Sequence, residues 1–181
     1  MRRMSLVAAI ALIGLAASAL ADGTIVRWNS VVGLSGQEAD SPNLVVGDMY
    51  PLVNWIRVEG GKAQLNLATG RIHIQIQNVT WAVHGAGTYR NPIGNPLGGY
   101  PEFPRTGTFV CDSVGKYGGP ISVHTEFVYL DASGSLNYHG RVDVPTLCRD
   151  YPDQIAFVFG SAGNRYFAFG AAQQVLSSHE D

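Results

Sequence analysis

The feature that most constrains this fold is a stretch of strict two-residue alternation at residues 62–77, KAQLNLATGRIHIQIQ. Leucines alternate with amides before the triplet Ala68-Thr69-Gly70, and isoleucines alternate with polar residues after it. Successive side chains of a β-strand point to opposite faces, so the pattern predicts two strands, each with one buried and one solvated face. The triplet has the composition of a turn. The stretch therefore predicts an antiparallel hairpin with a dry aliphatic face and an amide-rich wet face.

The wet face of this hairpin carries few charges. Such a face can bind sugars or a protein partner, but most polar sheet faces are only solvated, and we favour the solvated interpretation. His73 belongs to this face, and the sequence gives it no special role.

The rest of the chain after residue 21 shows almost no helical periodicity. Short runs rich in β-branched and aromatic residues alternate with Gly, Pro, Asn and Asp clusters, and the sequence holds 22 glycines and 9 prolines. This pattern is typical of antiparallel β proteins. We expect an all-β, single-domain antiparallel β-sandwich over residues 22–172, with a partly open β-barrel as the alternative, and a polar tail at 173–181. The expected strands are 25–32, 53–58, 63–67, 71–79, 107–111, 121–130, 135–144, 154–159 and 165–171.

The N-terminus has the pattern of a secretory signal peptide. Arg2 and Arg3 precede an apolar run, and the small residues Ala19 and Ala21 form an A-x-A cleavage pattern. We expect residues 1–21 to be removed and the protein to be exported by a bacterium to the periplasm or beyond, with no membrane span after cleavage. Removal leaves ten Lys and Arg against fourteen acidic residues. The chain has no basic run, so a nucleic-acid partner is not expected.

The sequence contains two cysteines, Cys111 and Cys148. In an oxidising compartment the favoured interpretation is a disulfide between them. A free thiol pair and a metal site are the alternatives, but neither cysteine has a second ligand within a few residues, which disfavours zinc. No cofactor is implied.

Residues 121–144, ISVHTEFVYLDASGSLNYHGRVDV, gather titratable groups around a turn at Asp131–Gly134. If Leu130 faces Ser135 in a hairpin, one face is apolar and the other is polar. That register sets Glu126 opposite His139, with His124 two residues along the same face.

Two chemical interpretations of this predicted face compete with an ordinary one. His124, Glu126 and His139 could ligate a metal, or Glu126 and His139 could act as a general acid–base pair. The favoured interpretation is a set of solvated cross-strand ion pairs. Arg141 also argues against a metal, because a guanidinium beside the ligands would repel it.

A Gly- and Pro-rich segment, residues 85–106, carries Tyr89, Tyr100 and Phe103. A loop of that length in a compact domain is usually functional or disordered. The three aromatic residues are candidates to bind a ligand or partner. Packing of the segment as an Ω-loop over a sheet end is the favoured alternative.

Two resemblances follow from these motifs. GKAQLNLATGRIHIQIQNV at residues 61–79 resembles the strand–turn–strand of CHRD domains, which are secreted β modules of chordin and of bacterial proteins. Those domains continue with a histidine-containing segment, where this chain has Ala82-Val83-His84-Gly85. Over its mature length, with WNSVVG, GTFVC, Cys148 and IAFVFGSAGNRYFAFGA, the chain is similar to small secreted bacterial proteins of unassigned activity. The resemblance implies secretion, a β fold and a disulfide, and it transfers no catalytic residue.

The function expected from the sequence is that of a secreted, non-enzymatic binding or surface-interaction module. Its ligand would be a carbohydrate or a protein surface. The alternatives are a metal-dependent or acid–base hydrolase that uses His124, Glu126 and His139, and a structural component of a secreted assembly. The sequence contains no G-x-S-x-G motif that would supply a hydrolase nucleophile.

Overall fold

The computed structural model describes residues 23–34, 45–52, 56–81, 104–161 and 163–177. The expected signal peptide and the loop residues Tyr89, Tyr100 and Phe103 lie outside these ranges. The described strands are β1 (Ile25–Gly33), β2 (Tyr50–Pro51), β3 (Ile56–Arg57), β4 (Gly60–Asn66), β5 (Arg71–Gln77), β6 (Thr80–Trp81), β7 (Arg105–Cys111), β8 (Ile121–His124), β9 (Leu136–Arg141), β10 (Ala156–Ser161) and β11 (Arg165–Leu176). A short helix, α1 (Thr146–Asp150), and a 3₁₀ turn, Pro152–Gln154, precede β10.

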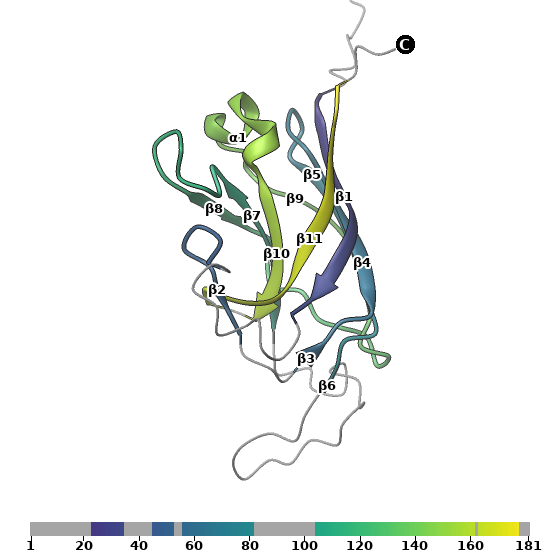
Figure 1. Ribbon diagram of the computed structural model, residues 1–181. Helices are drawn as coiled ribbons and strands as arrows, with labels where there is room; N and C mark the ends of the chain where they lie inside the picture. Colours follow the sequence, from purple (N-terminus) through teal and green to yellow (C-terminus); the bar gives the residue numbers. More distant parts are fainter. Residues whose placement is uncertain (1–22, 35–44, 53–55, 82–103, 162, 178–181) are drawn as a thin grey trace, which may run out of the picture.

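Most of these strands belong to one curled sheet, in the order β8-β7-β10-β11-β1-β4-β5-β9 (Figure 1). Its neighbouring strands are antiparallel, apart from the short β2, which pairs in parallel with β11. The curl forms a half-barrel whose edge strands are β8 and β9. β3 and β6 form a separate two-stranded sheet. The expected all-β, antiparallel class is confirmed, and the single curled sheet agrees with the partly open barrel.

The hairpin predicted at residues 62–77 is present as β4 and β5. Leu65 lies opposite Ile72, and both side chains are buried. The turn is closed by Asn66, whose Oδ1 accepts the backbone N–H groups of Ala68 and Thr69. Gly70 has a φ of +69°, and a Cβ there would lie 2.0 Å from a backbone carbonyl oxygen. The turn therefore needs glycine at this position.

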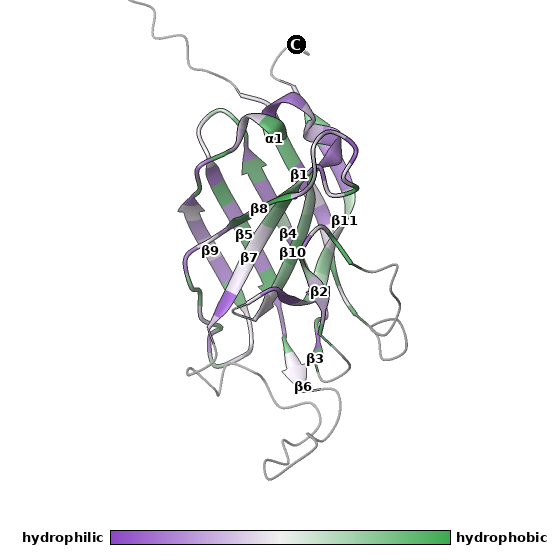
Figure 2. Ribbon diagram, turned by 90° about the vertical axis from the view of Figure 1, so that its left-hand side faces the viewer, coloured by the Kyte–Doolittle hydropathy of each residue, from purple (hydrophilic) through white to green (hydrophobic). Residues whose placement is uncertain are grey.

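The concave side of the sheet holds the main core. Trp28, Phe109 and Phe157 pack there with ring centroids 5.2–5.7 Å apart. Residues of β4 and β5 alternate in hydropathy along each strand, and the ribbon of Figure 2 is banded accordingly. This alternation directs the aliphatic residues inward and leaves polar residues on the outer face.

A second apolar cluster covers part of the outer face. Val110 of β7 and Val158 of β10 pack there with Met49, from the segment that leads into β2. Every residue of β7 is consequently buried. The outer face of β1, β4, β5 and β9 instead carries polar side chains that are partly or fully exposed. The fold thus closes one half of the outer surface and leaves the other half to solvent.

The hairpin predicted for residues 121–144 is wrong. β8 pairs with β7, and β9 pairs with β5, at opposite ends of the strand order. The turn itself forms as expected, since Asp131 Oδ1 accepts the backbone N–H groups of Ser133 and Ser135. The two strands diverge from it to different neighbours.

The alternation also breaks between Thr125 and Val128. Thr125 still bonds to Gly107, but Val128 bridges to Arg105, so one extra residue is inserted relative to β7. Such a bulge shifts which side chains face inward. Val128 is buried, while Phe127 and Tyr129 are 60% and 54% exposed.

The disulfide is confirmed. Cys111 ends β7, Cys148 lies in α1, and the bond joins them with Cα atoms 5.0 Å apart. Both residues are fully buried.

β11 continues to Leu176, so residues 173–176 of the expected tail are strand and pair with β1. No helix in the described ranges is long and apolar enough to cross a membrane.

Candidate functional site

The three residues proposed as a metal or acid–base site do not come together. His124, at the exposed end of β8, has its Nδ1 2.9 Å from Thr108 Oγ1. Glu126 Oε1 accepts a hydrogen bond from the Tyr138 hydroxyl at 3.0 Å. Tyr138 and His139 are neighbours in β9, so their side chains point to opposite faces of the sheet. Among the described residues, no group of three or more His, Cys, Asp or Glu is placed to hold a metal ion.

The Glu126 contact has an electrostatic consequence for Tyr138. Burial raises the pKa of the Tyr138 hydroxyl, and the hydrogen bond and charge of Glu126 raise it further. Tyr138 thus remains a protonated donor. Its side chain lies over Gly140, where a Cβ would approach the hydroxyl to 2.2 Å. The hydrogen bond from Tyr138 to Glu126 therefore connects the edge strand β9 to the segment after β8. Glu126 is thus the partner of Tyr138 and not of His139.

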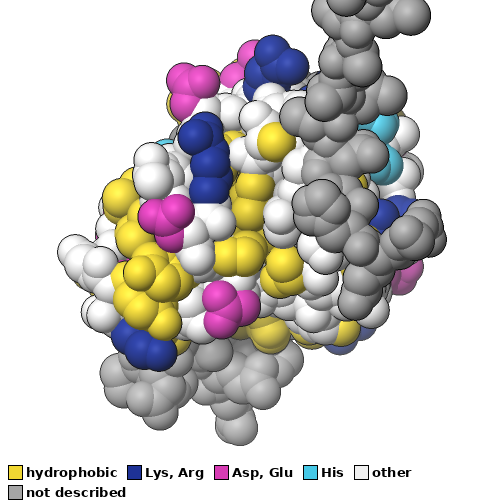
Figure 3. Space-filling model, turned by 90° about the horizontal axis from the view of Figure 1, so that it is seen from above, with side chains coloured by type: hydrophobic (Ala, Val, Ile, Leu, Met, Phe, Trp, Pro, Cys, Tyr) yellow, Lys and Arg dark blue, Asp and Glu magenta, His cyan; other side chains and the backbone are white. Residues whose placement is uncertain are grey.

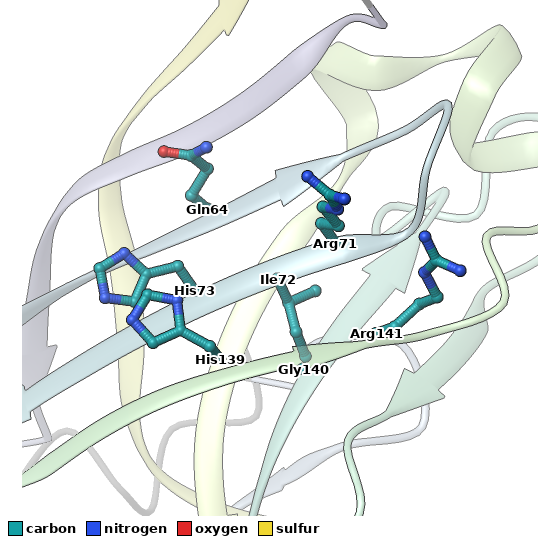
Figure 4. A pocket seen from close by; sticks show the side chains of 7 residues that line it. All are labelled: Gln64, Arg71, Ile72, His73, His139, Gly140 and Arg141. Atoms are coloured by element: carbon teal, nitrogen blue, oxygen red, sulfur yellow. The ribbon is translucent and has the colours of Figure 1, made fainter.

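His139 instead meets His73. The two residues lie directly opposite each other on β9 and β5. Their imidazole rings stack with centroids 4.0 Å apart and planes 14° apart (Figure 4). His73 Nε2 lies 2.9 Å from Asn137 Oδ1, on the next outward position of β9. His73, for which no role was expected from the sequence, is therefore part of a pair.

The pair belongs to a row of side chains that crosses four strands. Arg27 of β1 lies opposite Gln64 of β4, Gln64 lies opposite His73, and His73 faces His139. Arg27 Nη2 donates to Gln64 Oε1 at 3.3 Å. Since neighbouring strands are about 4.8 Å apart, the row spans about 14 Å.

Two further cationic positions flank this row. Arg71 on β5 lies directly opposite Arg141 on β9, and both side chains are exposed. Figure 4 shows them extending from the same face as the histidine pair. Like charges directly opposite each other destabilise a sheet. We call the outward side chains of this region the basic face: Arg27, Lys62, Gln64, Arg71, His73, His139 and Arg141.

The basic face contrasts in charge with the whole chain. The protein has a formal net charge of −2, yet β1, β4, β5 and β9 contain no Asp or Glu. The nearest acidic residues along the chain are Glu59, just before β4, and Asp143, two residues after β9. The fold therefore gathers four of its twelve Lys and Arg on a surface built from strands without a carboxylate.

The surface between these side chains is hollowed into two open depressions. One has a volume of 570 Å³ and lies around the histidine pair, Arg71 and Arg141. The other, of 290 Å³, is lined by Arg27, Asn29, Lys62, Ala63, Gln64 and His73. Gln64 and His73 line both, so the depressions adjoin along the row. An extended ligand could lie across them.

Only part of the basic face could be predicted from the sequence. Alternation in residues 62–77 places Lys62, Gln64, Arg71 and His73 on one side of a hairpin. Arg27 and Arg141 are distant in sequence, and only the pairing of β1 with β4 and of β9 with β5 brings them alongside. That pairing was not predicted.

A second exposed surface lies at the end of the molecule that carries α1. There Tyr117 stacks on Tyr151 with ring centroids 3.6 Å apart, and Lys116 Nζ lies 4.9 Å from the Tyr117 ring centroid. Val114, beside them in sequence, is 72% exposed. Figure 3 looks onto this end and shows hydrophobic side chains beside basic and acidic ones.

The loop at this end is organised by Asp112. Its buried carboxylate accepts backbone N–H groups of Lys116, Tyr117 and Gly119 at 2.6, 2.8 and 3.0 Å. Burial raises the Asp112 pKa, but the hydrogen bonds outweigh it and leave the pKa below its ordinary value. The polar and aromatic groups of this loop thus interact with one another, and these contacts are sufficient to explain their presence as stabilising the loop.

Comparison of the chain with known protein families, with curated proteins and with solved structures finds no significant match.

Proposed function

We propose that this protein is a secreted, non-enzymatic binding module whose basic face holds an acidic polysaccharide. The observation that carries the proposal is the pairing of Arg71 with Arg141 directly beside the pairing of His73 with His139. Both arrangements set cationic or protonatable groups against each other, and a bound anion would turn that repulsion into attraction.

The shape of the face favours an extended polymer over a small molecule. Its two depressions are open and adjoin along a row of about 14 Å. Small-molecule sites, in contrast, are usually concave and bury most of the ligand. A polymer with regularly spaced anionic groups can contact Arg27 at one end and Arg141 at the other.

The side chains of the face suit a sugar polymer. Guanidinium groups bind carboxylate and sulfate groups with two parallel hydrogen bonds. The amide of Gln64 in the face, and the amides of Gln75 and Asn137 next to it, can donate to and accept from sugar hydroxyls. Trp28 and Tyr138 of these strands belong to the inner side, so the face offers no indole or phenol ring on which the bases of a single-stranded nucleic acid could stack.

Export forms part of the proposal. It is supported by the signal-peptide pattern at residues 1–21 and by the Cys111–Cys148 disulfide, because disulfides persist mainly in oxidising compartments. An exported module would meet acidic polysaccharides at a cell surface or in an extracellular matrix.

The test compares dextran sulfate with uncharged dextran, each immobilised on a sensor surface. The protein should bind dextran sulfate and leave dextran unbound. Arg71→Gln/Arg141→Gln should weaken binding about 25-fold, since each charge near a ligand anion contributes about fivefold in a water-like dielectric. The matched control, Arg57→Gln/Arg149→Gln, removes two exposed arginines from β3 and α1 and should bind as the wild type does.

The proposal fails if the two double variants bind equally well, because the contact would then be a non-specific charge effect. Tighter binding to single-stranded DNA than to dextran sulfate of equal charge would assign the face to nucleic acid instead.

A further inference from the structure

We propose that the stacked His73–His139 pair makes anion binding at the basic face stronger as the pH falls. This inference rests on the proposed function and adds a regulatory property to the same site. The pair lies in the middle of the residues that define the face, with Gln64 on one side and Arg71 and Arg141 further along the two strands.

Hydrogen bonding fixes which nitrogen of His73 can gain a proton. Nε2 lies 2.9 Å from Asn137 Oδ1, and an amide oxygen only accepts hydrogen bonds. Nε2 therefore donates, and Nδ1 is the position that takes up the second proton. A charged imidazole also donates from Nε2, so this bond persists in both protonation states. His139 is exposed and can exchange protons with solvent.

The surroundings of the pair are cationic or neutral from every strand packed beside it. β1 contributes Arg27, and β4 contributes Lys62 and Gln64. β5 and β9 contribute Arg71 and Arg141, together with the amides of Gln75 and Asn137. The four strands contain no Asp or Glu, and Glu59 and Asp143 lie beyond their ends.

In this setting proton uptake and anion binding favour each other. A bound anion beside the pair favours the protonated, positively charged rings. Because the coupling is reciprocal, protonation must strengthen anion binding by the same factor. Histidine changes charge between about pH 5 and pH 8, so the effect falls in that range.

The direction follows from the proton balance. If the complex binds more protons than the free protein, the affinity rises as the pH falls. Each imidazolium next to a ligand anion contributes about fivefold, so two together give about 25-fold between the neutral and the fully charged pair. This gain is complete once both rings are charged and is lost as the pH rises and they become neutral.

Dextran sulfate is a suitable probe because its sulfate esters stay ionised throughout this range. Its affinity for the wild type should rise about 10- to 25-fold from about pH 8 to about pH 5.5. His73→Asn/His139→Asn should show no such rise, whatever its affinity at the higher pH. His139→Asn alone, at an exposed position, should retain only part of the rise. The matched control His124→Asn, on β8, should keep the full rise.

Calorimetry gives a second measurement that does not depend on variants. Titration in two buffers with different ionisation enthalpies reports the protons taken up on binding, which should lie between zero and two near pH 6.5 and vanish near pH 8. A wild type that binds with no proton uptake, or a double variant as pH-dependent as the wild type, would overturn the inference while leaving the proposed function standing. Binding that is absent at every pH, or unaffected by Arg71→Gln/Arg141→Gln, would overturn both.

Discussion

Replacing Arg71 with glutamate should make the protein more stable while weakening its proposed binding. Arg71 lies directly opposite Arg141, and both side chains are exposed. The wild type therefore contains an unfavourable like-charge pair at this position, whereas Arg71→Glu creates a favourable cross-strand pair. If position 71 contributed only to the stability of the fold, an acidic residue would be favoured there over arginine.

The expected gain in the free energy of unfolding is about 1 kcal/mol. Directly opposed charges on a sheet contribute roughly 0.2–1 kcal/mol, with the sign set by whether they are like or opposite, so the substitution removes one such cost and adds one such benefit. Solvent exposure keeps both contributions small. For a domain of this size, 1 kcal/mol corresponds to a rise of about 2–4 °C in Tm.

Urea unfolding at low salt, followed by tryptophan fluorescence, measures the gain, because Trp28 is buried in the core. The gain should shrink in about 1 M salt, where exposed charges are screened within about 3 Å. Arg71→Glu/Arg141→Glu restores a like-charge pair and should lose the gain, so the wild type, Arg71→Glu, Arg141→Glu and the double variant form a double-mutant cycle. The control Arg57→Glu, on β3, should change stability by less than about 0.5 kcal/mol.

The reasoning would be refuted if Arg71→Glu were less stable than the wild type, or no different from Arg57→Glu. Either result would mean that the two guanidinium groups do not repel each other appreciably. The cross-strand pairing would then be no evidence for a missing anion. Arg71→Glu should also bind dextran sulfate more weakly than Arg71→Gln, because it repels the ligand as well as losing a contact.

Two further predictions concern the covalent and polar supports of the fold. Cys111→Ser/Cys148→Ser should lower the free energy of unfolding by about 3–4 kcal/mol, since the bond closes a loop of 37 residues, and reduced wild type should show a similar loss in urea. Equal urea midpoints for oxidised and reduced wild type would contradict this. Asp112→Asn should be less stable than the wild type near neutral pH, because an amide offers one acceptor oxygen where the carboxylate offers two. The pKa of Asp112 is depressed, so the stability that its charge contributes is present above the ordinary pKa of an aspartate and is lost as the pH falls through the lower pKa of the folded state. The wild type and Asp112→Asn should therefore converge in stability in acid. A constant difference in stability down to about pH 2 would argue against the mechanism.

Local patterns in the sequence were sufficient for the features that local interactions determine. The β4–β5 hairpin follows from alternation and from the requirement for Gly70, all within 16 consecutive residues. The disulfide was predicted from the expected export to an oxidising compartment and from the presence of just two cysteines. Neither inference required knowledge of which distant strands pair.

The second hairpin failed because its strands prefer distant partners. Composition located the turn at Asp131–Gly134 correctly, but a turn does not require its flanking segments to pair with each other. Ile121–His124 instead extends the edge beside β7, and Leu136–Arg141 extends the edge beside β5. The bulge before Val128 then exposes Phe127 and Tyr129, which a continuous strand would have placed on the same face as the partly buried Val123. Sequence alternation alone could not show that inserted residue.

Consequently the sequence pointed to the right histidine with the wrong partner. His139 was expected opposite Glu126, in an arrangement that would suit proton transfer or a metal. It lies opposite His73, with Arg71 and Arg141 at the next outward positions of the two strands and with an amide as the hydrogen-bond partner of His73. A second imidazole in place of the expected carboxylate removes the negative charge that a bound cation would need, and it is the basis of the anion binding that we propose.

The division of the outer surface adds an argument for function. The Met49 segment covers the apolar outer positions of β7 and β10, so that half of the sheet is closed by packing within the chain. The other half could have been made soluble with charges of both signs interspersed, which also gives favourable cross-strand pairs. Instead its four strands carry cations, amides and a histidine pair, with arginine set against arginine in an acidic protein. Because its charges are all of one sign, this surface is less stable than one with favourable cross-strand pairs. An anionic partner that offsets the repulsion is the best explanation for such a surface.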